Sequence, residues 1–215
     1  MTPIVSVFAA SPDRGRGLAR DMAVRWALAE VGQGHDVRPL SFSELKTAEH
    51  KARQPFGQIP TYETDGLTLF ESGAIVLHIA ETHSSLLPVE PAARARAIAW
   101  MFAAVSTIEP VIVEREVAVL LEADKPWTHE RLPMLEARLR QRLDDLAAWL
   151  SGRDWLEGDF SAGDIMMGCV LRRLASAMLL RDYPVLAAYV ARAEARPAFQ
   201  TAFADQKARS DAAHG

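Results

Sequence analysis

One short segment combines a proline turn, a strand edge and a serine at the start of a helix, a set of groups that can bind a small peptide. Ile59-Pro60 leads into an alternating strand, and backbone at a strand edge can pair with an extended peptide. Ser72 precedes an apolar helical pattern, so its hydroxyl and the free N–H groups of the first helical turn can hold a carboxylate. These features predict a site for a peptide with a terminal carboxylate. An ordinary helix cap is the alternative for Ser72, because serine is a preferred N-cap.

The elements that would position this segment alternate between strands and helices. Asp65-Gly66 is a strong hairpin dipeptide between two short strands. Two glycines mark a loop at 11–17, and Gly32 is a plausible helix stop. The expected order is strand 4–10, helix 18–31, strand 35–42, a short polar helix or loop 44–53, strands 61–63 and 67–70, and a helix from Ser72. This is a thioredoxin-like order.

The rest of the chain reads as helical. Two prolines without periodicity suggest a linker at 86–91, and the long helical pattern 92–121 should bend at Pro110. Six leucines from Leu132 to Leu150 recur at steps of three and four, which predicts an amphipathic helix. We expect a capping box at 161–164 before a helix over 165–180, shorter helices after Pro184 and Pro197, and a frayed tail after Lys207. The predicted domains are therefore 1–85 and an all-helical 92–207.

Composition excludes several classes of protein. The 215-residue chain has a net charge of −4 with both signs spread along it, which argues against nucleic acid as a partner. Cys169 is the only cysteine, so an intramolecular disulfide and a cysteine-based zinc site are excluded, and the histidines have no metal-ligand spacing. The apolar run 4–10 is too short for a signal peptide, and we find no stretch approaching a membrane span. We expect a cytoplasmic protein without a metal.

Two motifs together resemble the glutathione transferase family. Ile59-Pro60 is followed by Glu71-Ser-Gly-Ala-Ile75 at the family's separation, and 154–165 looks like the capped core helix of its helical domain. The resemblance covers residues 4–203. It implies an α/β thioredoxin-like domain that binds glutathione, an all-α C-terminal helical bundle, a cis bond before Pro60 and a homodimer.

The resemblance also implies roles for individual residues at the glutathione site. Ile59 would pair through its backbone with the cysteinyl part of glutathione, with Pro60 setting the turn. Ser72 would hold the γ-glutamyl carboxylate, and Glu71 would lie near the α-amino group. Gln58 is favoured for the glycyl carboxylate. The other candidates for that contact, which read equally well as solvated surface, are His50, Lys51 and Arg53.

The reaction needs a thiolate, because the thiol itself is a poor nucleophile. Members of the family stabilise it with a Tyr, Ser or Cys after the first strand, and Ser11 is the best hydroxyl donor here. A turn cap with Pro12 is the alternative for Ser11. The family's Val-Arg-x-Ala-Leu helix motif starts unusually late, thirteen residues after Ser11, at Val24.

The intervening segment brings Arg14 and Arg16 close to the expected thiol. Either arginine could stabilise the thiolate, bind carboxylates of glutathione or bind an acidic second substrate. The alternative is an extended first helix with solvated arginines.

The implied activity is attack of the glutathione thiolate on a hydrophobic electrophile, as in detoxification. The electrophile would lie between the domains, against Trp100, Met101, Ala104 and Val105, although residues at such spacing are more often core. Alternatives are a disulfide reductase, peroxidase or isomerase that uses glutathione as its only thiol, or a non-catalytic binding or regulatory protein.

Overall fold

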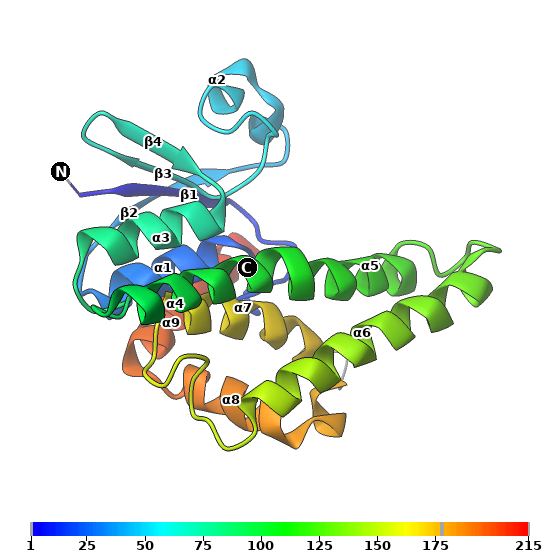
Figure 1. Ribbon diagram of the computed structural model, residues 1–215. Coiled ribbons are helices and arrows are strands. Elements are labelled where there is room, and N and C mark those ends of the chain that lie inside the picture. Colours follow the sequence, from blue (N-terminus) through cyan, green and yellow to red (C-terminus); the bar gives the residue numbers. More distant parts are fainter. Residues whose placement is uncertain (1, 177–178, 215) are drawn as a thin grey trace. The chain divides into compact units, whose positions relative to one another are not determined.

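A computed structural model describes residues 2–176 and 179–214, which form two compact units (Figure 1). One unit contains the residues up to Val89 together with those from Glu194 onwards, and the other runs from Glu90 to Ala193. The chain thus combines a four-stranded mixed sheet and its helices with a helical bundle. The predicted fold class, a thioredoxin-like domain followed by helices, is confirmed.

The first unit is built on a sheet with the strand order β2-β1-β3-β4. Strands β1 (Ile4–Phe8) and β2 (Asp36–Leu40) are parallel, with Ile4 opposite Asp36. Strand β3 pairs antiparallel with β1 and with β4. The hairpin strands are β3 (Thr61–Thr64) and β4 (Leu67–Phe70), joined by a turn in which Gly66 has a φ of +71°. A parallel pair needs a crossover, which here is a helix.

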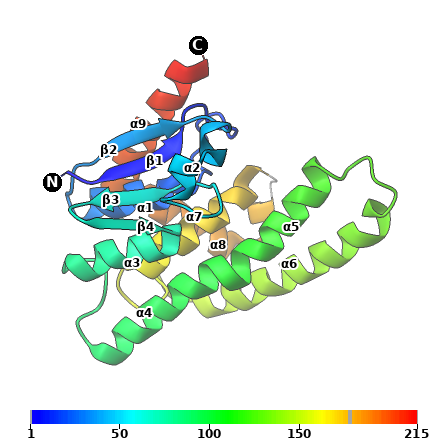
Figure 2. The same cartoon turned by 90° about the horizontal axis from the view of Figure 1, so that it is seen from above.

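Helices cover the sheet of this unit on both sides (Figures 1 and 2). Helices α1 (Asp21–Glu30) and α3 (Ser72–Thr82) lie together on one face. The 3-10 turn η1 (Glu44–Lys46) and helix α2 (Ala48–Lys51) lie on the opposite side in Figure 1. The segment before α1 is a loop, so the predicted helix start at Leu18 was three residues too early.

The last helix, α9 (Pro197–His214), belongs to the sheet unit and packs on α1. The rings of Trp26 and Phe199 make a T-shaped contact with 5.1 Å between centroids, and Arg196 pairs with Glu30 at 2.6 Å. Two predictions need correction. The unit boundary falls before α9, so residues 194–207 group with the sheet rather than with the helical domain 92–207. The tail after Lys207 is helical up to His214 rather than frayed, and Ser210 in this part of α9 is buried.

The named elements of the second unit are all helices or helical turns, and an isolated bridge pairs Glu157 with Asp159 in one of its loops. The predicted helix 92–121 divides into α4 (Pro91–Ala103), a π-helical turn η2 (Ala104–Ile108) and α5 (Glu109–Leu120). Pro110 explains the division, because it has no N–H and its ring crowds the carbonyl one turn earlier. The other elements are α6 (Thr128–Leu150), α7 (Ala162–Ser176), a 3-10 turn η3 (Leu179–Asp182) and α8 (Pro184–Glu194). Residues 177–178 of the predicted helix 165–180 lie outside the described ranges.

Side-chain patterns predicted from the sequence are visible in this unit. The leucine stripe of α6 is buried from Leu135 to Leu150. Asp164 accepts hydrogen bonds from the backbone N–H groups of Leu156 and Ser161, and from the hydroxyl of Tyr189 at 2.8 Å. Burial raises the pKa of the Asp164 carboxyl. The capping box is therefore structural, as expected.

Among the described residues, one helical stretch is long and apolar enough to cross a membrane by length and composition, namely Pro91–Leu120. The sequence-based expectation that no stretch approaches a membrane span was wrong, because this stretch contains an 18-residue window with a mean hydropathy of 1.5. A core helix of a soluble protein passes the same test, so this is weak evidence of a span. Ala97, Met101 and Ile112 are buried in the helical unit.

Candidate functional site

The bond between Ile59 and Pro60 is cis, which confirms that prediction. Both residues are buried, and the N–H of Thr61 donates to Ser6 Oγ at 2.6 Å, where β3 begins. Neither the N–H nor the C=O of Ile59 has a hydrogen-bond partner in the described part of the chain. The turn before β3 therefore leaves one donor and one acceptor of the backbone without a partner in the described part of the chain.

Two side chains hold the loop that precedes this turn by forming hydrogen bonds with its backbone. His50 is buried and its Nε2 lies 2.7 Å from the carbonyl oxygen of Gln58. Gln54 Oε1 accepts from the N–H groups of Phe56 and Gln58. Gly57 has a φ of +64°, and a Cβ there would lie 2.7 Å from the carbonyl oxygen of Leu45. The loop before Ile59 thus requires glycine at 57.

Ser72 is the first residue of α3, and its hydroxyl does not cap that helix. Glu71 occupies the cap position with a φ of +70°, and the first helical hydrogen bond runs from Ile75 N–H to its carbonyl at 3.0 Å. Ser72 is buried, and its hydroxyl has no partner among the described residues. The alternative for Ser72, an ordinary N-cap, is therefore wrong by one position. Its hydroxyl and the N–H groups of the first turn remain open to a carboxylate.

The four candidates for the glycyl carboxylate differ in whether their side chains already have partners within the protein. They are His50, Lys51, Arg53 and Gln58. Arg53 pairs with Glu63 and with Glu49, and His50 is used within the loop. The side chains of Lys51 and Gln58 are exposed and make no hydrogen bond or ion pair with the described chain. Lys51 and Gln58 are therefore the candidates whose side chains are open.

Ser11 lies in the loop after β1, and its hydroxyl is already a donor. Ser11 Oγ donates to Asp13 Oδ1 at 2.6 Å, and both residues are buried. Asp13 also accepts from the N–H groups of Gly15 at 3.0 Å, Leu18 at 2.5 Å and Ala19 at 3.3 Å. Burial alone would raise the pKa of Asp13, but these four hydrogen bonds lower it below its ordinary value.

The segment around Asp13 is a loop that continues up to the start of α1 at Asp21. Asp13 accepts from the N–H groups of Leu18 and Ala19 within this loop, so the alternative of an extended first helix is wrong. Arg14 and Arg16 point outward from this loop and are exposed. Arg14 has a φ of +52°, and Arg16 Nε donates to the carbonyl of Asp13 at 3.0 Å.

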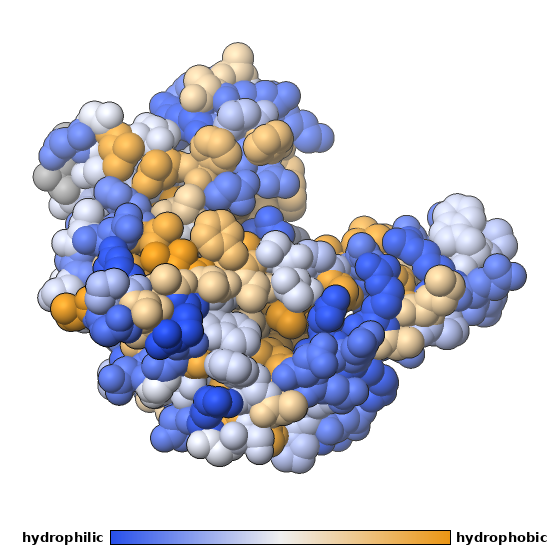
Figure 3. Space-filling model, in the orientation of Figure 1, coloured by the Kyte–Doolittle hydropathy of each residue, from blue (hydrophilic) through white to orange (hydrophobic). Residues whose placement is uncertain are grey.

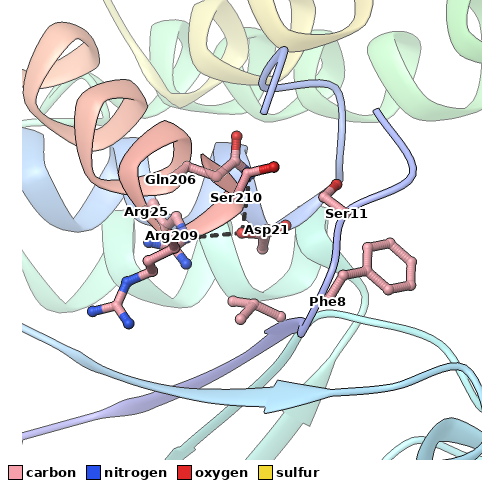
Figure 4. Close-up of a pocket in the computed structure, with 8 residues that line it drawn as sticks. Phe8, Ser11, Asp21, Arg25, Gln206, Arg209 and Ser210 are labelled. Carbon is pink, nitrogen blue, oxygen red and sulfur yellow. Dashed lines mark hydrogen bonds and ion pairs between the residues drawn. The ribbon is translucent and has the colours of Figure 1, made fainter. Parts of the chain in front are cut away.

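A small cavity beside Ser11 is lined by β1, α1 and α9 (Figure 4). Its volume of about 20 Å³ has room for a single water molecule. Gln206 donates through Nε2 to Asp21 at 3.1 Å, while its buried Oε1 has no partner in the described chain. The residues that line this cavity are Val7, Phe8, Ser11, Asp21, Arg25, Gln206, Arg209 and Ser210.

Sequence reasoning missed Asp13 and the contribution of α9. An Asp two residues after a serine is a recognisable signal for a hydroxyl–carboxylate pair, and it was available. No local sequence pattern predicts the hydrogen bond between Gln206 and Asp21, because 185 positions separate the two residues. Burial raises the pKa of the Asp21 carboxyl, against the opposing effect of the neighbouring Arg25.

The residues expected to face an electrophile differ in how deeply they are buried. Met101 and Ala104 are buried within the helical unit, as the core alternative states. Trp100 donates from Nε1 to Glu157 at 3.0 Å, and Val105 is half-buried. Figure 3 shows apolar residues scattered among hydrophilic ones on the face in view. Cys169 is half-buried in α7, and residues 2–176 and 179–214 contain no group of three or more potential metal ligands.

Comparisons with known proteins agree with these two units. Family models match residues 14–81 (Glutathione S-transferase, N-terminal domain) and residues 117–192 (Glutathione S-transferase, C-terminal domain). Glutathione S-transferase 4 of Zea mays is 30% identical over 92% of this chain and 91% of its own length. A probable glutathione S-transferase of Oryza sativa subsp. japonica is 32% identical over 74% of this chain and 75% of its own.

A solved structure has the same fold. The glutathione transferase of Pseudomonas putida, crystallised with one glutathione disulfide bound per subunit, is 22% identical and superposes with a TM-score of 0.81. The match covers 94% of this chain and 90% of that one.

Proposed function

Since this chain belongs to the glutathione S-transferase family, we propose that it binds glutathione and activates its thiolate for attack on a hydrophobic electrophile. The observation that carries the proposal is the pair of open backbone groups on Ile59 beside cis Pro60, within the same unit as the unpartnered hydroxyl of Ser72. An extended peptide with a carboxylate end matches both sets of groups.

In this proposal each end of glutathione has a partner. Ile59 exchanges backbone hydrogen bonds with the cysteinyl residue, while Ser72 and the first turn of α3 hold the γ-glutamyl carboxylate. Glu71, whose side chain is exposed, favours the charged α-amino group. Gln58 or Lys51 meets the glycyl carboxylate.

The chemical step begins with loss of the thiol proton, after which one bond forms and one breaks at the electrophile. The glutathione thiol gives its proton to solvent, and the sulfur then forms a bond to the electrophile as the leaving group departs with the bonding pair. Ser11 and the cationic side chains of Arg14 and Arg16 are proposed to stabilise the thiolate. The family relationship also supports a cytoplasmic homodimer, which we include in the proposal.

A glutathione-binding protein without turnover is the second candidate. The observation that favours it is the engagement of the Ser11 hydroxyl with Asp13, which leaves the expected donor occupied. A glutathione-dependent disulfide reductase or peroxidase would need glutathione itself as its thiol, because Cys169 lies in the helical unit.

The test measures binding and thiol activation separately. Calorimetric titration with glutathione and with S-methylglutathione reports occupation of the groove, and the ultraviolet absorbance of the thiolate against pH reports activation. We expect binding of both compounds and a thiol pKa below that of free glutathione. Binding without a lowered thiol pKa selects the non-catalytic candidate, and absence of binding rejects both.

A further inference from the structure

The hydroxyl proton of Ser11 points to the carboxylate of Asp13. A serine hydroxyl has a single O–H donor, and an ionised carboxylate can only accept. The 2.6 Å contact between Ser11 Oγ and Asp13 Oδ1 therefore fixes the direction of donation. What Ser11 can offer to a third group is a lone pair on its oxygen.

Asp13 is held firmly in this arrangement. Its two carboxylate oxygens accept three backbone N–H groups, from Gly15, Leu18 and Ala19, in addition to the Ser11 hydroxyl. The side chain is buried, and the same hydrogen bonds keep its pKa below the ordinary value, so it is ionised at neutral pH. A hydrogen bond to an ionised acceptor is roughly twice as strong as a neutral one.

We propose that Asp13 is a positioning residue that holds the Ser11 hydroxyl proton against its own carboxylate, so that Asp13 competes with a bound glutathione thiolate for that proton. This inference rests on the proposed glutathione site. Ser11 can stabilise the thiolate only by leaving Asp13, and each gain at sulfur is offset by a loss at the carboxylate. Arg14 and Arg16, both exposed in the same loop, are then the remaining candidates for stabilising the thiolate.

The experiment is a double-mutant cycle read by the pKa of the bound glutathione thiol. The four proteins are the wild type, Ser11→Ala, Asp13→Asn and the double variant, each saturated with glutathione as judged by calorimetry. Asp13→Asn alone lowers the thiol pKa through the lost negative charge, and Asp36→Asn, which removes an exposed carboxylate from the same unit, is the matched charge control. The informative quantity is the change that Ser11→Ala causes in the thiol pKa, measured once with Asp and once with Asn at position 13.

With Asp13 present, we expect Ser11→Ala to leave the thiol pKa unchanged within error. With Asn at position 13, the same substitution should raise it by about one unit, the value of one hydrogen bond to a charged group. Equal effects of Ser11→Ala in both backgrounds, whether large or absent, overturn the inference. A purely structural role of Asp13 would change stability without making the thiol pKa depend on Ser11.

Two further outcomes are decided by the same set of proteins. If Asp13→Asn does not fold, Asp13→Ser replaces it in the cycle, and a rise of about one unit for Ser11→Ala in the wild-type background already overturns the inference. If the wild type does not bind glutathione, the proposed function fails and the inference falls with it. If the wild type binds glutathione but Ser11→Ala changes the thiol pKa equally in both backgrounds, the proposed function is retained. Only the competition between Asp13 and the thiolate is then rejected.

Discussion

Arg25 Nε lies 2.8 Å from Asp21 Oδ2, one turn away on α1, and both side chains are almost completely buried. Their remaining partners come from α9, where Asp205 accepts from Arg25 and Gln206 donates to Asp21. The last helix of the chain thus completes the hydrogen bonding of the first. The network lines the cavity beside Ser11 (Figure 4), so α9 supports the candidate site as well as the sheet unit.

Arg25→Met should destabilise the protein by about 3–5 kcal/mol, because it leaves the Asp21 carboxylate buried without its cationic partner. Arg209→Met is the matched control, since Arg209 pairs with the same Asp205 while half of its side chain is exposed. Its loss should cost about 0–1 kcal/mol. Urea unfolding of both variants gives the comparison, and similar costs would contradict the role assigned to the buried pair.

Gly57→Ala should destabilise the protein more than Gly32→Ala does. Both glycines have a positive φ, +64° and +68°, and alanine in that conformation costs about 1–2 kcal/mol at either position. Only at 57 would the added Cβ meet backbone, 2.7 Å from the carbonyl oxygen of Leu45, whereas nothing lies within 4 Å at 32. Thermal unfolding measures the difference. Since Gly57 precedes Gln58, we also expect weaker glutathione binding in Gly57→Ala alone.

Ser72→Ala should weaken glutathione binding about tenfold, the value of one hydrogen bond to a charged group. The unfolding free energy should stay unchanged within a few tenths of a kcal/mol, because the hydroxyl does not cap α3. Calorimetry and urea unfolding measure the two quantities. Ser84→Ala, at an exposed serine, serves as the control for both. A loss of stability typical of a cap, about 1 kcal/mol, would show that Ser72 caps the helix after all.

Asp13 should make stability depend on pH in a predictable direction. Its pKa is lower in the folded than in the unfolded protein, so folding favours the ionised form. The stabilisation is present above the unfolded value of 3.8 and is lost as the pH falls through the lower folded value. Asp13→Asn should therefore be less stable than the wild type at neutral pH, by about 1–3 kcal/mol. Urea unfolding over a pH series should show the gap closing in acid, and a gap that widens there would contradict the assignment.

Local patterns sufficed for most of the strands and helices and for the turn before β3. The hairpin at Asp65-Gly66, the leucine stripe of α6 and the turn at Ile59-Pro60 each depend on residues only a few positions apart. The failures have a different origin. Helix α1 starts three residues later than predicted, after a loop in which Asp13 accepts from the N–H groups of Leu18 and Ala19. Ser72 sits one position inside α3 because Glu71 adopts a positive φ.

What the sequence determined alone was the order of strands and helices, the family motifs and the residue types that can hold a peptide carboxylate. Only the tertiary structure decided that α9 joins the sheet unit and that the Ser11 proton is directed to Asp13. Periodicity and capping follow from backbone geometry over one or two turns, so they can be read from the chain itself. The placement of α9 depends on burial and hydrogen bonds between residues nearly the whole chain apart, and the direction of one proton depends on angles that only a packed loop specifies.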